Sequence, residues 1–331
     1  MMLSRRTLVS SIPLLFAKTS ARAQPRGVAD SGGWPARPVR FIVPAAAGSA
    51  GDDVCRLVAA QLSERFGQQF VIVNQPAAVG TLAVQDLARA TPDGYTIGQI
   101  TTSTQVIAKL YNPDLSYDGI KDFALISLLG NSPYVLAVYP GMPVKSVAEL
   151  LALAKAKPQP LSNAAFGTMS LGYLASKLFE RQAGIALNQI PYRSSAQAVI
   201  DVVAGRVDMQ FSTLPPAVPL IRTAKLRAIA TTGAQRFATL VEVPTLAESG
   251  FPGFDVALWL GLAAPAGTPP DIVAKLNSAL VALLGTAEMR DAMLRQSFVA
   301  ESSSPDALAR RIGADMGKWR DVVAAAGATK N

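Results

Sequence analysis

Residues 39–62 of the chain read VRFIVPAAAGSAGDDVCRLVAAQL. The apolar run Val39–Val43 predicts a buried strand, and apolar residues at helical spacing over 54–62 predict an amphipathic helix. Between them, residues 45–51 are all small. A loop that leads from a strand into a helix points backbone N–H groups, and the positive end of the helix dipole, at one place. The stretch therefore predicts an anion site, with an ordinary tight turn as the alternative.

The same order of strand, loop and helix occurs twice more in the first third of the chain. The strand at 70–73 leads into the loop at 74–81, and the strand at 95–100 leads into the hydroxyl-rich residues 101–104. In a parallel sheet with right-handed crossovers these loops share one edge, where α/β proteins bind ligands. We therefore expect Thr102 and Thr104 to face the same site.

The second half of the chain predicts another α/β lobe. Three strands that end in polar loops are predicted: one before a helix at 171–183, one at 190–195 and one at 206–212. Ser170 is expected to cap the helix at 171–183. Two extended segments, at about 132–138 and 257–264, are expected to cross between the lobes. This predicts a clamshell that closes on a small molecule. We expect a signal peptide at 1–23, a first lobe formed by 24–132 and 256–331, and a second lobe formed by 133–255.

The composition of the chain argues against several classes of function. The chain has 331 residues, of which 50% are hydrophobic, and a formal net charge of +8. Residues 1–23 have the basic start, short apolar stretch and small-residue cleavage site of a secretory signal, by the general or the twin-arginine route. Without them 27 basic and 23 acidic residues remain, about +4. The basic residues are scattered, which argues against nucleic-acid binding, and no later run predicts a membrane helix, so the mature chain is not expected to be membrane-embedded.

The sequence offers little for catalysis. It has no histidine, which excludes the usual Ser-His-Asp and Cys-His hydrolases and histidine-based zinc sites. Its one cysteine, Cys55, is expected to be packed as a small apolar residue. Ser170 lies between Gly167 and Gly172, one residue off the spacing of a nucleophile elbow, so a hydrolase that uses Ser170 is the less favoured alternative. We expect no catalytic residue, no metal and no cofactor.

Several short motifs in this order resemble one family along the whole mature chain. The chain resembles the substrate-binding proteins of tripartite tricarboxylate transporters, the Bug family of periplasmic receptors. The resemblance is carried by Trp34-Pro35, the first loop up to Asp52, Asn74-x-Pro76, Pro92-Asp93-Gly94-Tyr95-Thr96, Tyr117-Asp118, Pro191-Tyr192, Leu226-Arg227-Ala228, Val243-Pro244-Thr245, 264–269 and Lys318-Trp319.

The resemblance implies a two-lobed type II periplasmic binding fold, no catalysis and a periplasmic monomer. It implies a small organic carboxylate held between the lobes, gripped mainly through backbone amides and waters. Its partners would be the membrane subunits of a transporter or, alternatively, a membrane sensor kinase. The implied ligand-binding residues are Ala46, Ala47, Gly48, Ser49 and Asp52 in the first loop, Ala78, Val79, Gly80 and Thr81 in the second, and Thr168, Ser170, Tyr192, Ser194 and Ser195 in the opposite lobe.

Two departures from the family pattern concern the ligand. Arg193 stands in place of a usual lysine and could pair with a second carboxylate, with a solvated residue at a helix start as the equal alternative. Ser212 replaces an aspartate that could meet an ammonium group, which argues against an amino-acid ligand. Both residues are included among the expected ligand contacts.

Overall fold

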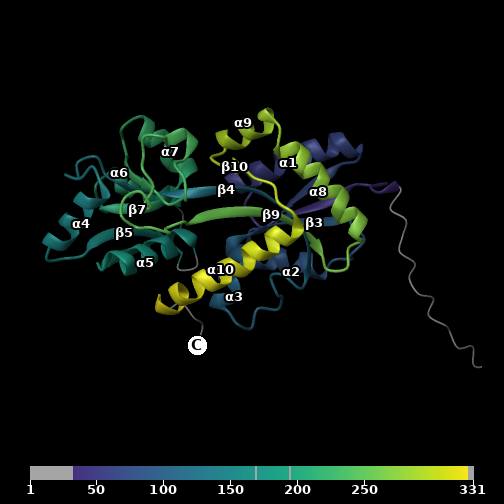
Figure 1. Cartoon of the computed structure of the whole chain (residues 1–331), viewed down its shortest axis with the longest axis horizontal. Coiled ribbons are helices and arrows are strands. Elements are labelled where there is room, and N and C mark those ends of the chain that lie inside the picture. Colours follow the sequence, from purple (N-terminus) through teal and green to yellow (C-terminus); the bar gives the residue numbers. More distant parts are fainter. Residues whose placement is uncertain (1–32, 168–169, 194, 327–331) are drawn as a thin grey trace, which may run out of the picture. The chain divides into compact units, whose positions relative to one another are not determined.

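The computed structural model (Figure 1) describes residues 33–167, 170–193 and 195–326. The expected signal peptide lies outside the described residues. The described elements all belong to one unit of the chain, Ser31–Asn331. Within the described residues ten strands form one sheet, on which helices pack in two groups that we call the first and second lobes.

The first lobe is built on parallel strands, as the apolar runs predict. Strand β1 (Val39–Val43) lies between β2 (Phe70–Asn74) and β3 (Thr96–Thr101), and pairs with both in parallel. Strand β9 (Ala257–Pro265) then pairs antiparallel with β3. Because the parallel strands end at the same edge, the loops after β1 and β2 are neighbours.

The second lobe repeats the arrangement with β5 (Leu161–Phe166) at its centre. Strand β5 pairs in parallel with β6 (Leu187–Tyr192) and, at one position, with β7 (Met209–Thr213). Strand β8 (Arg227–Thr231) pairs with β4.

Strand β4 (Phe123–Val138) joins the two lobes. The sequence predicted an extended segment at about 132–138, and the structure shows that it is the second half of one 16-residue strand. Its residues up to Pro133 pair antiparallel with β9, and those from Tyr134 pair with β7 and β8. Proline removes one N–H but keeps an extended backbone, so the buried strand continues. Figure 1 shows β4 and β9 side by side between the lobes.

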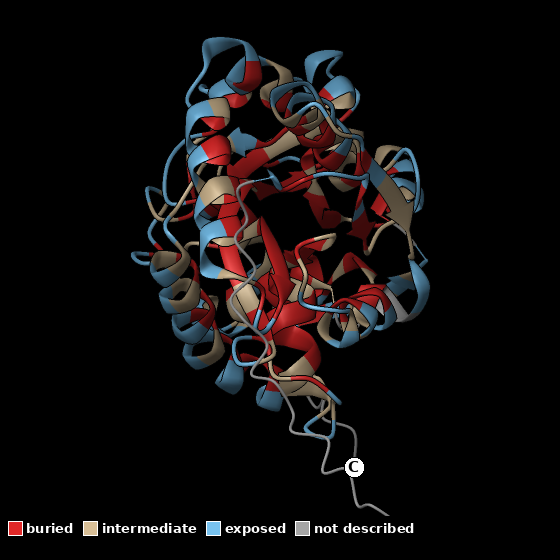
Figure 2. Ribbon diagram, turned by 90° about the vertical axis from the view of Figure 1, so that its right-hand side faces the viewer, coloured by how far each residue is buried: buried red, intermediate tan, exposed pale blue. Residues whose placement is uncertain are grey.

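Helices cover the sheet, and most buried residues lie on the sheet and the inner helix faces (Figure 2). The helices are α1 (Ala50–Phe66), α2 (Thr81–Arg89), α3 (Ala108–Tyr111), α4 (Val147–Ala156), α5 (Leu171–Ala183), α6 (Ser195–Val203), α7 (Leu214–Arg222), α8 (Pro270–Leu284), α9 (Ala287–Arg295) and α10 (Pro305–Ala325). Shorter turns are η2 (Ala77–Gly80), η3 (Ser103–Ile107) and η4 (Ala238–Leu240), and β10 (Val299–Ala300) pairs with β4.

The C-terminal helices return to the sheet. Helix α8 contacts β4 and α1, while α10 contacts β4, η3 and α3 of the first lobe and also α5 of the second. The indole of Trp259 donates to Asp315 at 2.7 Å, which ties α10 to β9. In the described part of the chain no single helix has the length and apolarity to cross a membrane, although α8 and α9, bent by 80° at their junction, pass that test together.

Candidate functional site

The first loop has the geometry that its small residues predict. Strand β1 ends at Val43, and α1 starts at Ala50 with Ser49 as its N-cap. The Ser49 hydroxyl accepts from the amide of Asp52 at 3.4 Å, and the Ser49 carbonyl accepts from Asp53 at 2.9 Å. The two preceding helix amides, of Ala50 and Gly51, have no carbonyl partner within the helix, because the first turn of a helix provides none. The start of a 17-residue helix thus offers N–H donors.

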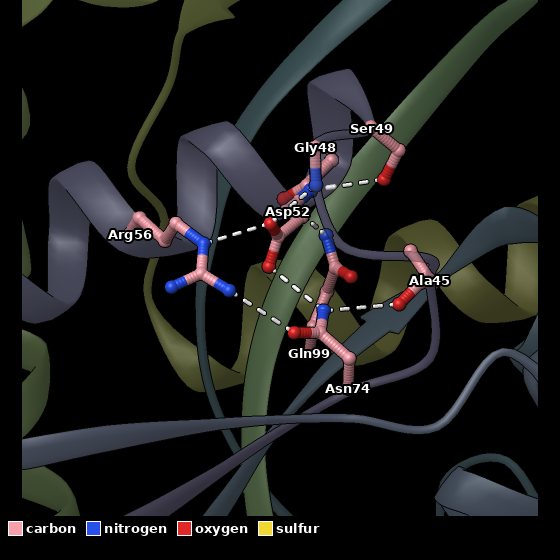
Figure 3. Close-up of polar contacts among 8 residues, drawn as sticks. Ala45, Gly48, Ser49, Asp52, Arg56, Asn74 and Gln99 are labelled. Carbon is pink, nitrogen blue, oxygen red and sulfur yellow. Dashed lines mark hydrogen bonds and ion pairs between the residues drawn. The ribbon is translucent and has the colours of Figure 1, made fainter.

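An ionic network holds this loop in place (Figure 3). The carboxylate of Asp52 accepts from the backbone amide of Gly48 at 2.9 Å, from Nε of Arg56 at 2.8 Å and from the Asn74 amide nitrogen at 2.8 Å. Asn74 also donates to the carbonyl of Ala45 at 3.0 Å and accepts from Arg56 at 3.1 Å. One carboxylate and one amide side chain therefore connect both ends of the loop to strand β2.

The Asp52 side chain is fully buried. Burial would raise the pKa of its carboxyl, but the hydrogen bonds from Arg56, Asn74 and Gly48 outweigh that effect and the pKa lies below its ordinary value. The guanidinium of Arg56 balances the carboxylate charge. Asp52 was predicted to touch the ligand; the structure shows its oxygens engaged by the loop, which is the geometry of a residue that positions the donors.

The second loop lies against the first. Gly80, at the end of η2, has φ +84°, and a Cβ there would meet Pro44 Cβ at 2.6 Å and the Pro44 carbonyl oxygen at 2.8 Å. Only glycine permits this approach. Of the predicted residues of this loop, Gly80 is buried and Thr81 begins α2, while the side chains of Ala78 and Val79 lie outside what the structure describes.

A cavity of about 420 Å³ opens next to the first loop. Its lining at one end is the range Gly48–Gly51, which we call the amide end. The apolar part of the lining, which we call the apolar wall, is formed by Tyr134, Ala196, Pro215, Pro216, Leu258 and Phe298. Ser132, Pro133 and Thr213 complete the described lining. Both lobes and the crossing strands β4 and β9 thus contribute to one site of ligand size.

The cavity meets the beginnings of two further helices. Helix α7 presents Pro215 and Pro216 in its first turn, and a proline has no backbone N–H to offer an anion. Helix α6 reaches the cavity through Ala196. The start of α1 and the start of α7 therefore differ in kind: small residues with amides at one, proline rings at the other.

Two of the predicted serines of the second lobe bond to Thr213, which lines the cavity. The Ser195 hydroxyl, 8% exposed, accepts from the Thr213 amide at 3.3 Å and from the Gln210 amide nitrogen at 3.2 Å. Ser212 is fully buried, with its hydroxyl 3.3 Å from that of Ser195, and donates to the Thr213 carbonyl at 2.9 Å. Both serines fix Thr213 at the edge of the cavity.

Other residues that were predicted to contact the ligand have structural contacts or lie outside the cavity lining. Thr102 is buried and accepts from the Trp259 amide at 3.3 Å. Thr104 is buried and bonds to Thr101, and its carbonyl accepts from the Tyr117 hydroxyl at 2.6 Å. Neither is among the described residues that line the cavity. In the first loop Ala46 and Ala47 are exposed and are likewise outside that lining.

In the second lobe, too, some of the residues predicted to contact the ligand have structural contacts or lie outside the cavity lining. Ser170 is the N-cap of α5 and accepts from the Tyr173 amide at 3.1 Å, as expected for a cap. The Tyr192 hydroxyl donates to Asp201 at 2.7 Å, and burial together with that carboxylate raises the pKa of Tyr192 to about 12. Arg193 is exposed and is not among the described lining residues. The predicted Thr168 and Ser194 lie outside the described residues.

Sequence reasoning missed the apolar wall. Leu258 and Phe298 carry no polar signal, and they reach the site from β9 and from the segment before β10. The pair Pro215-Pro216 after the hydroxyl residues 212–213 was the available sequence signal, since prolines there mark a helix start without donors. Cys55 is buried, and burial raises the pKa of its thiol well above the usual range, as for a packed residue.

The fold and the cavity together define a class: two-lobed α/β binding proteins that hold a small molecule between their lobes. The model of the tripartite tricarboxylate transporter family receptors matches residues 54–328. The chain belongs to this receptor family, as the resemblance predicted. Protein BugT of Bordetella pertussis is 31% identical over 315 residues, which are 95% of this chain and 96% of BugT.

Solved structures agree in fold. The R. palustris protein Rpa4515 with adipate is 34% identical, with a TM-score of 0.79 over 89% of this chain and 98% of that one. MatC from Rhodopseudomonas palustris with bound malate is 32% identical, with a TM-score of 0.74 over 88% of this chain and 100% of that one. Both are similar to this chain along nearly their whole length, so the two-lobed fold is confirmed.

Proposed function

We propose that this protein is a periplasmic receptor that captures a small organic carboxylate in the 420 Å³ cavity and delivers it to the membrane subunits of a tripartite tricarboxylate transporter. The observation that carries the proposal is the amide end: Gly48–Gly51, at the start of α1, line a cavity shared by both lobes. A carboxylate placed there receives N–H donors and the positive end of the helix dipole.

Two observations support a carboxylate as the ligand. Structures of relatives contain adipate and malate, which are both carboxylates. In addition, the guanidinium of Arg56 neutralises Asp52, the carboxylate that holds the loop in place. No catalytic step is proposed, because Ser170 caps a helix and Cys55 is buried.

The proposed division into lobes places residues 24–132 and 256–331 in the first lobe and 133–255 in the second. It is supported by strand β4, whose partners change from β9 to β7 and β8 between Pro133 and Tyr134. Closure would then bend the chain at this change of partners and at the facing start of β9, bringing the second-lobe residues Ala196, Pro215 and Pro216 towards the amide end.

A thermal-shift screen of mono-, di- and tricarboxylates tests the binding step. A ligand at 100 times its Kd stabilises the native state by about 2.7 kcal/mol, a readily measured increase in Tm. We expect at least one carboxylate to give this shift, and the corresponding amide or alcohol to give none. If neutral analogues stabilise the protein equally, the carboxylate is not what the site recognises.

Transport is tested separately. Vesicles that contain the membrane subunits should take up the radiolabelled ligand only when the receptor is added to the outside. If the receptor binds the ligand without supporting uptake, the delivery step is wrong while the binding step stands.

A further inference from the structure

We propose that Arg222 and Asp291 form an electrostatic latch between the lobes: they pair when the lobes close on the ligand, and the pair stabilises the closed state. This inference rests on the proposed function, since it concerns the closure that captures the ligand. It is carried by a second cavity, of about 350 Å³, which we call the α7–α9 gap. Residues of α7, η4 and α9 line this gap, together with Ser297.

The helices α7 and α9 belong to different lobes. Met289 and Met293 of α9 are buried in the core that surrounds β1 and α1. Leu214 and Ala217 of α7 are buried in the core that includes residues of β4, β5 and α6. Leu294 of α9 is half-buried and packs against this second core. The lobes therefore touch at α9, and Figure 1 shows α7 and α9 next to each other where the lobes meet.

Charged side chains from both lobes line the α7–α9 gap. Arg222 is in the last turn of α7, where the helix dipole favours a cation, and Asp291 and Arg295 are on α9. All three residues are exposed. Within the described part of the chain none of them forms an ion pair. Opposite charges from the two lobes thus share one gap without being paired in this conformation.

The gap and the ligand cavity lie along the same two elements. Pro215, Val218 and Arg222 are spaced i, i+3 and i+7, so they lie on one face of α7. Pro215 lines the ligand cavity, and the other two line the gap. In the first lobe Ser297 lines the gap and the next residue, Phe298, lines the ligand cavity. A movement of α7 towards the first lobe therefore narrows both cavities.

Only one attractive pair in the gap depends on closure. Asp291 and Arg295 are four residues apart on one helix, so their spacing along α9 is the same in every state. Arg222 is on the other lobe, and its distance from Asp291 shortens as the gap narrows. An ion pair at an exposed site stabilises a protein only slightly, which suits a receptor that must also release its ligand. The pair shifts the population of closed protein, and with it the ligand affinity, by a small factor.

Charge exchange between the two helices tests the latch. The probes are hexanoate, adipate, malate and citrate, and the acid that binds the wild type most tightly in isothermal titration is used throughout. Arg222→Glu and Asp291→Arg each place like charges across the gap and should raise the Kd about fivefold. The double variant Arg222→Glu/Asp291→Arg restores opposite charges and should bind within about twofold of the wild type. Lys225→Glu changes an exposed charge just after α7, outside the described lining of the gap, and should leave the Kd unchanged.

Two further measurements separate the latch from other effects of the charges. At a salt concentration of about 1 M, which screens exposed charges, the Kd values of the two single variants should approach that of Lys225→Glu. Without ligand the Tm of the single variants should equal that of the wild type, because Arg222 and Asp291 are not paired in this conformation. A lower Tm without ligand would mean that the pair already stabilises the open protein, and would overturn the latch.

A neutralising variant distinguishes the latch from an anion site formed by the two arginines. Arg222→Gln should raise the Kd about threefold, whereas Arg295→Gln removes a charge that repels Arg222 and should not weaken binding. Equal losses in these two variants would show that both arginines hold an anion, and would overturn the latch. If the double exchange variant binds as weakly as the single variants, the latch is wrong and the receptor function stands. If none of the four acids binds the wild type, the proposed function fails and the latch fails with it.

Discussion

Helices α1 and α7 begin at the same cavity but present opposite chemistry to it. Helix α1 begins with Ala50 and Gly51, whose amides have no carbonyl partner within the helix, next to an ion pair in which Asp52 is buried and Arg56 is half exposed. Helix α7 has Pro215 and Pro216 in its first turn, next to a neutral network around Ser195. The comparison teaches that a helix start becomes an anion site only when its first residues leave the donors open. The start of α1 is thus suited to hold the charge of a ligand, and the apolar wall, to which both lobes contribute, is suited to hold its body.

The largest effect is expected from filling the amide end. Gly48→Trp should weaken carboxylate binding by at least about 100-fold, because the indole would occupy the space next to the loop donors. Gly48 has φ +75°, so the change also adds strain of about 1–2 kcal/mol. Gly184→Trp is the matched control: it has φ +63°, open space around its Cβ and no place in the described cavity lining. Equal losses of binding in the two variants would contradict the assignment of the amide end.

A smaller loss is expected from releasing the first loop. Asp52→Ala leaves the Gly48 amide and the Asn74 amide group without their acceptor, so we expect about 2 kcal/mol lower stability in chemical denaturation. Ligand affinity should fall about 10-fold as the loop donors lose their fixed positions. Asp53→Ala removes a neighbouring charge from the same helix turn and should have a much smaller effect on both. Unchanged affinity in Asp52→Ala would show that the network does not position the donors.

Removing a positioning contact in the second lobe should have a smaller effect on stability and affinity. Ser195→Ala removes the acceptor of the Thr213 amide and of Gln210, which should lower stability by about 1 kcal/mol and affinity about threefold. Ser176→Ala removes another buried hydroxyl, one that donates to the Tyr173 carbonyl, and should lower stability without an effect on affinity. A loss of affinity in Ser195→Ala as large as that in Asp52→Ala would remove the asymmetry between the lobes.

The smallest effect concerns pH. The pKa of Asp52 is lower in the folded protein than in the unfolded chain, so its stabilising effect is complete above the unfolded pKa of about 3.9. That contribution is lost as the pH falls through the folded value. Unfolding measured at several pH values should therefore show a smaller loss of stability below pH 4 in Asp52→Asn than in the wild type. Parallel curves would mean that the Asp52 carboxyl titrates alike in both states.

The sequence predicted the first loop well because its signal is contiguous. Strand, small residues and helix follow one another over residues 39–62, so local rules suffice. The positioning contacts of Asp52 were harder to predict, because they depend on Asn74, 22 residues away along the chain. The i,i+4 spacing of Asp52 and Arg56 was a signal that could have indicated an ion pair.

The apolar wall could not be predicted in the same way. Leu258 and Phe298 have the pattern of core residues, and only the tertiary fold brings them next to Pro215 and Pro216. For a similar reason Ser195 and Ser212 were expected at the ligand, whereas the structure shows both bonded to Thr213. A hydroxyl in a loop at the end of a strand can contact a ligand or can hydrogen-bond to neighbouring backbone. Burial shows that these two serines do the latter: Ser195 is 8% exposed and Ser212 is fully buried.

A crystal structure of the protein with a bound monocarboxylate such as hexanoate is the most direct test. We predict both carboxylate oxygens within hydrogen-bond distance, directly or through one water, of the backbone amides of Ala50 and Gly51, and the hydrocarbon end against Pro215, Pro216 and Phe298. A carboxylate bound to Arg193 instead, or a ligand bound outside this cavity, would contradict the account.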